Sequence, residues 1–233
     1  MKKIFFGLMT LSMALSFASC QKIYYQVCTT KASDPSVFTS QTDRYVYENE
    51  DVKIIYNMWC DDGDRGFVMY NKTNEYINLS HYESCATSTQ VGKEGEWTLG
   101  YFGDATVVAP HTYAVFESDY VIVKDAILCE GLKEKVRHSE SKSFDKQNSP
   151  LEFANHITYY YYPSNGDKKV EKTLVHSFYI DRITNYKQKD YLKMKASYIV
   201  RTDKLDNGKL KPGQGMPKYE PVNRKGFYNT YIK

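Results

Sequence analysis

The stretch "DVKIIYNMWC", residues 51–60, decides the fold class of this chain. Its alternate residues share one face of an extended chain and are apolar, namely Val52, Ile54, Tyr56, Met58 and Cys60. Successive side chains of a β-strand point to opposite sides of a sheet, so a period of two predicts a strand with one buried face. The opposite face is mixed and is expected to be partly covered; it carries Lys53, Ile55, Asn57 and Trp59.

The residues after this strand predict a hairpin and further strands. The loop "DDGDRG" at 61–66 contains glycine, and "FVMYN" at 67–71 is the expected returning strand. Short apolar runs bounded by polar turn residues predict more strands at 75–80, 111–118 and 119–125.

A second hairpin is predicted near the middle of the C-terminal half. The runs "SPLEFANHITYYYY" (149–162) and "VEKTLVHSFYI" (170–180) flank the pair Asn165–Gly166. Both residues of this pair accept the positive φ that a tight hairpin turn needs. In the second run Leu174, Phe178 and Ile180 are expected on one face, with His176 among them.

Two other segments complete the secondary-structure prediction. The best helical candidate is "DAILCEGLKEKVR" (125–137), which contains Gly131. Residues 201–221 are rich in Lys, Gly and Pro and are expected to be irregular, and "GFYNTYIK" (226–233) is expected to return as a strand.

The N-terminus predicts export with a lipid anchor. A basic start and a short apolar run lead to "LSFASCQK", residues 15–22. The run is shorter than the roughly 20 apolar residues that span a bilayer, so it is typical of a signal peptide. "FASC" resembles a lipobox, which predicts cleavage before Cys20 and a diacylglycerol and acyl lipid on that cysteine. The alternative is ordinary secretion with cleavage elsewhere.

The chain is therefore expected to have a mainly β fold, an immunoglobulin-like β-sandwich with extra C-terminal strands. Its 22 tyrosines and its Thr, Val, Ile and Phe residues support this, because aromatic and β-branched residues favour strands. The expected organisation is a lipoprotein signal peptide at 1–19, a polar tether at 20–41, a β-sandwich domain at 42–200, and a basic irregular segment with a returning strand at 201–233.

Charge is unevenly spread along the chain. The formal net charge is +3, but residues 182–233 alone carry 13 Lys or Arg against four Asp or Glu. A basic segment can bind anionic lipid headgroups or nucleic acid. An exported lipoprotein seldom meets nucleic acid, so we expect no such partner. We expect the segment to fold back on the acidic remainder or to be solvated.

Four cysteines follow the proposed anchor: Cys28, Cys60, Cys85 and Cys129. Disulfides persist outside the cytoplasm, and four cysteines allow three pairings that the sequence does not separate. Free buried thiols and a single bridge remain open alternatives. No CxxC pair occurs, and His81 with Cys85 alone does not make a zinc site.

Two groups of side chains are weighed as candidate sites. Asp61, Asp62 and Asp64 offer oxygen ligands at short spacing, but the closing Glu of an EF-hand loop is missing, so no metal is expected. In "TYYYY" alternate residues face opposite sides, so half of these tyrosines are expected in the core. Tyr160 and Tyr162 are the candidate ligand-facing aromatics, whose rings could stack on sugars.

The sequence gives no catalytic signature. Five scattered histidines form no HExxH motif, and no nucleophile elbow, P-loop or dinucleotide fingerprint is present. No catalytic residue and no cofactor other than the lipid on Cys20 is therefore expected. The sequence favours a non-enzymatic binding or structural module over an envelope hydrolase, with a carbohydrate-binding accessory protein as the alternative.

Several blocks together resemble a group of uncharacterised Bacteroidetes lipoproteins. The blocks are "YYQV" after the lipobox, "YNMW…GFVMYNKTNEYINLS", "VVAPHTYAVFESDY" and "FDKQNSPLEFANHITY…FYIDRITNY". The resemblance implies a β-rich fold in the cell envelope, with the membrane as a partner through the anchor and an envelope protein or glycan as a possible second partner. It implies no site residue. In such bacteria an acidic stretch after the anchor marks surface export, and "QKIYYQVCTTKAS" has none. We therefore expect an outer-membrane lipoprotein on the periplasmic face.

Overall fold

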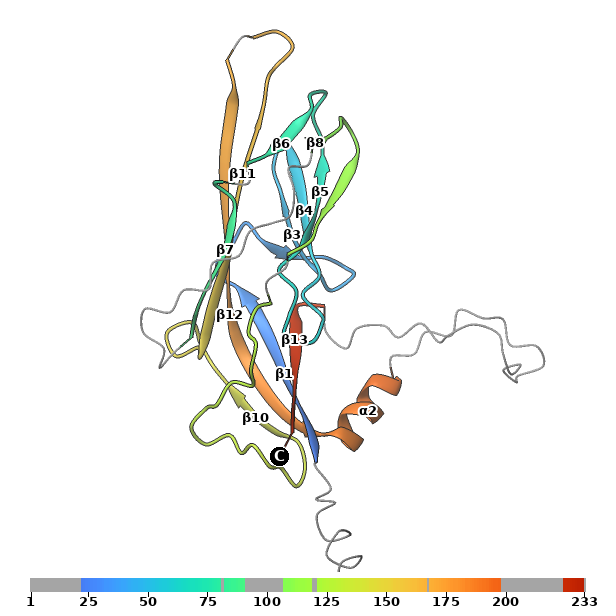
Figure 1. Ribbon diagram of the computed structural model, residues 1–233, viewed down its shortest axis with the longest axis vertical. Helices are drawn as coiled ribbons and strands as arrows, with labels where there is room; N and C mark the ends of the chain where they lie inside the picture. The colour runs from blue at the N-terminus through green and yellow to red at the C-terminus, as the bar shows by residue number, and fades with distance from the viewer. Residues whose placement is uncertain are drawn as a thin grey trace, which may run out of the picture.

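The computed structural model describes residues 22–80, 82–90, 107–118, 121–166, 168–197 and 224–232. Within these residues the chain forms two antiparallel sheets, one of eight strands and one of five. In Figure 1 the larger sheet runs along the long axis of the molecule, and the smaller sheet lies beside its upper part. The two-layered, mainly β sandwich predicted from the sequence is confirmed, while its immunoglobulin-like character is not.

The larger sheet has the strand order β13-β1-β12-β11-β6-β8, with β10 paired to β12 and β7 paired to β11. Its strands are β1 (Ile23–Ala32), β6 (Ile77–Leu79), β7 (Cys85–Gln90), β8 (Val107–Val108), β10 (Glu140–Ser143), β11 (Leu151–Tyr161), β12 (Val170–Lys187) and β13 (Gly226–Ile232). The smaller sheet has the order β2-β3-β4-β5-β9. Its strands are β2 (Phe38–Thr39), β3 (Tyr45–Glu48), β4 (Val52–Tyr56), β5 (Phe67–Asn71) and β9 (Tyr113–Phe116).

The long strand β12 organises both halves of the molecule. Its first part pairs with β11 from Val170 to Tyr179, and its last part pairs with β1 as far as Lys187. The β1–β12 register shifts between Thr29 and Thr30, which is a β-bulge that changes the faces of the residues beyond it. Helix α2 (Gln188–Ser197) follows directly at the lower end of the molecule (Figure 1).

The core lies where the inner faces of the two sheets meet. The stretch that decided the fold class behaves as predicted, because Val52, Ile54, Tyr56 and Met58 are all buried. The larger sheet contributes alternate residues of β11 and β12 to this core, namely Phe153, Ile157, Tyr159, Phe178 and Ile180. Burying large apolar side chains stabilises a fold by roughly 1.5–3 kcal/mol each, so this layer contact dominates the stability of the sandwich.

Below the smaller sheet, residues 121–139 cover the larger sheet without regular structure; we call them the lower segment. A cross-strand row of three buried amide side chains holds it: Asn229, Gln26 and Asn185 stand opposite one another on β13, β1 and β12. We call these three residues the amide row. They donate to the carbonyl oxygens of Val123 (3.3 Å), Ile127 (2.9 Å) and Lys133 (2.9 Å), respectively.

The amide row explains why the helix predicted at 125–137 is wrong. Gln26 also accepts a hydrogen bond from the backbone N–H of Ile127 at 2.6 Å, so both backbone groups of that residue bond to a side chain instead of to a helix. Gly131 has a φ of 78°, outside the helical region. The tertiary bonds therefore override a moderate helix propensity.

Other sequence predictions are corrected at both ends of the fold. The polar tether expected at 20–41 is wrong over residues 23–32, which form β1 between β12 and β13. The strand expected at 119–125 is absent from its described part, residues 121–125, where Val121 makes only an isolated bridge to Asp64. Residues 201–221, expected to be irregular, lie outside the described residues.

The returning C-terminal strand is confirmed as β13. It pairs with β1 from Gly226 to Ile232, and Phe227 is fully buried in the core. Gly226 is required here, because a Cβ atom at this position would collide with the backbone carbonyl of Cys28. The basic C-terminal stretch is thus attached to the fold at its last described residues.

Candidate functional site

The three aspartates weighed as metal ligands lie in the loop between β4 and β5, and their carboxylates bond to neighbouring protein groups. Asp61 accepts from the N–H and hydroxyl of Thr230 (both 3.2 Å), and Asp62 accepts from the amide of Asn229. Asp64 accepts from the backbone N–H of Gly66 at 2.7 Å. In the described ranges no group of three His, Cys, Asp or Glu residues is placed to hold a metal ion.

This loop docks on the lower half instead of forming a tight hairpin tip. Asp62 and Gly63 have φ values of 62° and 81°, and a Cβ on Gly63 would collide with Ile122. Arg65 is buried, and its Nη2 donates to the carbonyl oxygen of Ile122 at 3.1 Å. Burial lowers the pKa of Arg65 to about 10. The loop therefore joins β4, β13 and the lower segment.

The four tyrosines of "TYYYY" divide as the strand period predicts. Tyr159 is fully buried and Tyr161 points the same way, toward the smaller sheet. Tyr160 and Tyr162 lie on the other face, with their rings 6.2 Å apart and nearly perpendicular at 87°. The ammonium group of Lys169 lies 4.3 Å from the Tyr160 ring centroid. Whether this aromatic pair binds a ligand stays a prediction.

The cysteines Cys28, Cys60, Cys85 and Cys129 are all free thiols in the structure. Cys28 is fully buried, and this burial, with a smaller contribution from nearby Cys129, raises the pKa of its thiol. Burial also raises the pKa of Cys60 to about 11, reinforced by Asp64. A raised pKa leaves little reactive thiolate, so neither cysteine has the character of a nucleophile.

The most extensive polar cluster is built on the tight turn between β3 and β4. The side-chain oxygen of Asn49 accepts from the backbone N–H groups of Asp51 (2.9 Å) and Val52 (2.8 Å), while the Asn49 N–H donates to the carbonyl of Val52. Asparagine is favoured in turns because its side chain can make such local bonds. The turn aims the carboxylate of Asp51 across the sandwich at β11 and β12.

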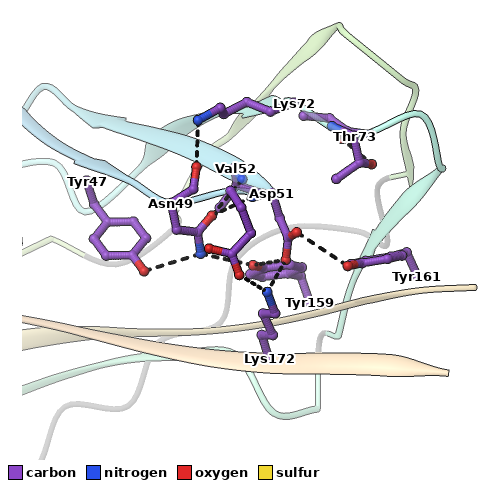
Figure 2. A network of polar contacts seen from close by, with 11 residues as sticks. Tyr47, Asn49, Asp51, Val52, Lys72, Thr73, Tyr159, Tyr161 and Lys172 are labelled. Carbon is purple, nitrogen blue, oxygen red and sulfur yellow. Dashed lines mark hydrogen bonds and ion pairs between the residues drawn. The ribbon is translucent and has the colours of Figure 1, made fainter. Parts of the chain in front are cut away.

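The Asp51 carboxylate, 4% exposed, joins the two sheets (Figure 2). It forms an ion pair with the Lys172 ammonium group at 2.7 Å, and it accepts hydrogen bonds from the hydroxyls of Tyr159 (3.0 Å) and Tyr161 (3.3 Å). Hydrogen bonds to Asp51 and Glu50 raise the pKa of Lys172. Burial, with a smaller contribution from Asp51, raises the pKa of Tyr159. Both groups keep their protons at neutral pH.

A second lysine closes the same cluster from the smaller sheet. The ammonium group of Lys72 donates to the carbonyl oxygen of Asn49 at 2.6 Å and forms an ion pair with Glu48 at 2.9 Å. Lys53 lies 3.7 Å from the other oxygen of Glu48. We call this group of residues, centred on Asp51 with Lys53, Lys72 and Lys172, the upper charge cluster.

The upper charge cluster has the residue types of an acid–base site, but its bonds are structural. Both Asp51 oxygens accept from groups on β11 and β12, and the carboxylate is shielded from water. A candidate general base needs to reach a proton on a substrate. Asp51 instead links the two sheets, so its role is structural and not catalytic.

A buried histidine lies in the same interface between the sheets. The Tyr56 hydroxyl and Nδ1 of His176 are 2.6 Å apart, and the His176 ring packs on Tyr47 with centroids 4.5 Å apart. Nε2 has no hydrogen-bond partner in the described part of the chain. Burial lowers the pKa of His176 to about 4, partly offset by Asp34. The imidazole is therefore neutral at neutral pH and packs as a core residue.

The outward side of the smaller sheet carries an exposed apolar surface. One cross-strand row consists of Ile55, Val68 and Val115, and the next consists of Lys53, Tyr70 and Tyr113. Tyr113 is 71% and Val115 is 60% exposed, although both belong to strand β9. All residues of these rows except Val115 line a groove of about 510 Å³, which Glu48 and Lys72 also line. We call this surface the outer face.

Comparison of the chain with protein-family models, with curated proteins and with solved structures gives no match. Among the helices of the described residues, none is long and apolar enough to cross a bilayer. The candidate surfaces must therefore be judged on their own chemistry.

The sequence prediction missed both the upper charge cluster and the outer face. One signal was present, because Lys172 shares the period of the inward residues Leu174, His176, Phe178 and Ile180. An inward lysine predicts a buried partner. The identity of that partner did not follow, since Asp51 lies 121 residues earlier in the chain.

Proposed function

We propose that this chain is a lipid-anchored protein of the bacterial cell envelope that acts as a non-enzymatic binding module. Acylation of Cys20 would hold it at the outer membrane, on the periplasmic face, as the resemblance to Bacteroidetes lipoproteins implies. The apolar run before "FASC" and the small residues at the expected cleavage site support this anchor.

The outer face is the observation that carries the binding function. Contiguous exposed apolar surface on a sheet is typical of an interaction site. Here it is continuous with β9, which has no neighbouring strand on its other side among the described residues. An edge strand presents unpaired backbone groups that can pair with an added strand.

The occupant that fits this edge is an extended segment of another envelope protein. Its backbone would pair with β9, and its alternate apolar side chains would lie beside Tyr113 and Val115. Enzymatic hydrolysis receives no support from the described polar clusters, whose carboxylates bond within the fold.

Metabolic labelling with palmitate tests the anchor. We expect the wild-type protein to incorporate the label and the Cys20→Ala variant to lose it. Label retained by Cys20→Ala would contradict the anchor.

Site-specific photo-crosslinking in cells tests the outer face. A photoreactive residue at Val115 should give one discrete product with an envelope protein, and the same residue at exposed Lys146 should give none. The crosslinked segment, made as a peptide, should bind the purified protein and bind at least about tenfold more weakly to Val115→Lys. Equal crosslinking at both positions, or equal binding by Val115→Lys, would overturn this assignment.

A carbohydrate ligand is the second candidate, and the pair of half-buried Tyr160 and exposed Tyr162 favours it. Their rings are perpendicular, so they would contact two faces of a sugar rather than form one flat platform. Affinity electrophoresis on envelope and host glycans tests this: retardation that weakens in Tyr160→Ala and Tyr162→Ala would support it. Unretarded migration on every glycan would remove it.

A further inference from the structure

A basic pocket lies at the lower end of the larger sheet. It has a volume of about 570 Å³, and five of its lining residues are cationic: Lys22, Lys135, Arg137, Lys187 and Lys189. No carboxylate lines it. It lies where the first residue of β1, the last residue of β12 and the first turn of α2 come together; Figure 1 shows these ends side by side.

The strand register explains how the pocket is built. Tyr24 stands opposite Lys187 on β12 and opposite Tyr231 on β13, one step beyond the amide row. Tyr24 is buried and its ring is stacked on that of Tyr231, with centroids 5.6 Å apart. The floor of the pocket is therefore fixed by the sheet.

The opposite wall is fixed as well. The Tyr231 hydroxyl donates to the carbonyl oxygen of Glu134 at 2.7 Å, and Asn185 donates to that of Lys133 at 2.9 Å. Val136, the next lining residue, is 3% exposed. The backbone that leads to Lys135 is thus held in place and Val136 is packed, so the stretch that carries Lys135 and Arg137 lies beside the hollow.

The five cations lack counter-charges within the described part of the chain. No ion pair or hydrogen bond of their side chains is found there, in contrast to the lysines of the upper charge cluster. Five like charges around one hollow repel one another, so an anion that enters relieves this repulsion. Planar Arg and mobile Lys donors together suit the several oxygens of a phosphate group.

The position of the pocket in the chain indicates where that phosphate comes from. Lys22 lies two residues after Cys20, and two residues span at most about 7 Å. If Cys20 carries the lipid, as proposed above, the pocket faces the headgroups of the leaflet that holds the anchor. This step rests on the proposed function.

We propose that the basic pocket binds the phosphate group of an anionic lipid headgroup at the membrane that holds the anchor. The contact would orient the protein with its lower end on the membrane and its outer face, at the other end of the molecule, away from it. The several acyl chains expected on Cys20 already give stable attachment, so the pocket would set the orientation of the protein on the membrane and not the strength of its anchoring.

Vesicle co-sedimentation tests the pocket without the anchor. The mature chain with Cys20→Ser cannot be acylated and is mixed with phosphatidylcholine vesicles with or without phosphatidylglycerol. We expect binding only when phosphatidylglycerol is present. The Lys135→Gln/Arg137→Gln variant should bind about tenfold or more weakly, because each cation near an anionic surface contributes appreciably.

A matched control distinguishes binding at the pocket from a general attraction between the positive charges of the protein and the anionic vesicle. Lys146→Gln/Lys168→Gln removes the same charge from exposed positions outside the pocket and should bind as the wild type does. Equal weakening of both double variants would overturn the proposal, as would binding to phosphatidylcholine alone. Circular dichroism of each variant shows that the fold is retained; if the pocket variant unfolds, Lys22→Gln/Lys189→Gln replaces it, since both side chains are exposed.

Soluble phosphate distinguishes the two sources of the ligand. Inorganic phosphate at about 10 mM should leave most of the vesicle binding intact, since a membrane presents many headgroups at once. Complete displacement would identify free phosphate as the occupant and would overturn the membrane source. If Cys20→Ala still incorporated palmitate while vesicle binding behaved as expected, the anchor at Cys20 would be contradicted and the pocket would stand.

Discussion

The upper charge cluster and the basic pocket lie at opposite ends of the same strand, β12, and use their cations differently. At the upper end Lys172 and Lys72 are paired with Asp51 and Glu48, and the Asp51 carboxylate is buried between the two sheets. At the lower end the neutral amide row joins the layers, and the cations beyond it have no counter-charge in the described residues. Charge at the upper end therefore links the two sheets, and charge at the lower end is available for the phosphate group proposed above.

Removing one cation from each end should give the largest difference in the free energy of unfolding. Lys172→Met leaves the buried Asp51 carboxylate without its ion-pair partner, and we expect the free energy of unfolding to fall by about 3 kcal/mol. Lys189→Met at the pocket should change it by about 0.5 kcal/mol or less, because surface cations contribute little to stability. Equilibrium urea denaturation measures both.

The Asp51–Lys172 coupling has its own control. The Asp51→Asn/Lys172→Met double variant should lose less stability than the sum of the losses of the two single variants. The double variant leaves no lone buried charge, whereas Lys172→Met alone does. Additive losses would show that the pair does not couple the two sheets.

Acid should weaken the upper interface through His176. Its pKa is lowered from 6.5 to about 4 in the fold, so the unfolded chain takes up a proton before the folded one does. The stabilisation is fully present above pH 6.5 and is lost as pH falls toward 4, by about 3 kcal/mol in total.

The variant His176→Asn isolates this effect, because an amide can replace Nδ1 in the contact with Tyr56 and does not titrate. Denaturation curves at pH 7 and pH 4 should show a smaller acid-induced loss for His176→Asn than for the wild type. Asp34 is the charged group that opposes the shift, so Asp34→Asn should enlarge the wild-type loss. Parallel pH profiles for His176→Asn and the wild type would contradict a neutral buried imidazole.

The lower segment should detach more readily from the larger sheet when a member of the amide row is replaced. Gln26→Met keeps the size of the side chain but leaves the N–H and C=O of Ile127 without partners, and we expect a loss of about 2 kcal/mol. Proteolysis should then cut the lower segment faster, which limited digestion followed by mass spectrometry would detect. Resistance equal to that of the wild type would mean that the amide row does not hold this segment.

The smallest effect is expected at an exposed pair of the upper cluster. Lys53 lies 3.7 Å from Glu48, and both side chains are partly exposed. Lys53→Gln should lower the free energy of unfolding by about 0.5 kcal/mol or less in urea denaturation. A loss as large as that of Lys172→Met would show that the burial of the carboxylate partner does not decide the contribution of a lysine in this cluster.

Local patterns predicted the upper half of the fold better than the lower half. The period of two placed Val52, Ile54 and Tyr56 in the core, and it separated Tyr159 from Tyr160. It works there because each strand buries one apolar face against the other sheet.

Apart from strand β13, the lower half was not predicted, because buried polar side chains hold its layers together where apolar side chains hold the upper half. Gln26 and Thr30 are buried in β1, although polar residues of this kind predict a solvated tether from the sequence alone. The bonds from Gln26 to Ile127 span 101 residues and overrode a local helix signal. The Asp51–Lys172 pair and the basic pocket also join distant segments, and a single sequence contains no record of which distant residues meet.

A salt titration tests most directly whether the charges at the upper end stabilise the fold and those at the lower end bind a ligand. One protein is measured at each salt concentration for its stability and for its binding to vesicles. The Cys20→Ser chain is measured between about 0.05 M and about 0.5 M NaCl, which shortens the screening length from over 10 Å to a few ångströms. We expect the free energy of unfolding in urea to stay nearly constant, because the Asp51 carboxylate is buried, while the affinity for phosphatidylglycerol vesicles falls about tenfold or more. A marked loss of stability with salt, together with unchanged vesicle affinity, would contradict the account.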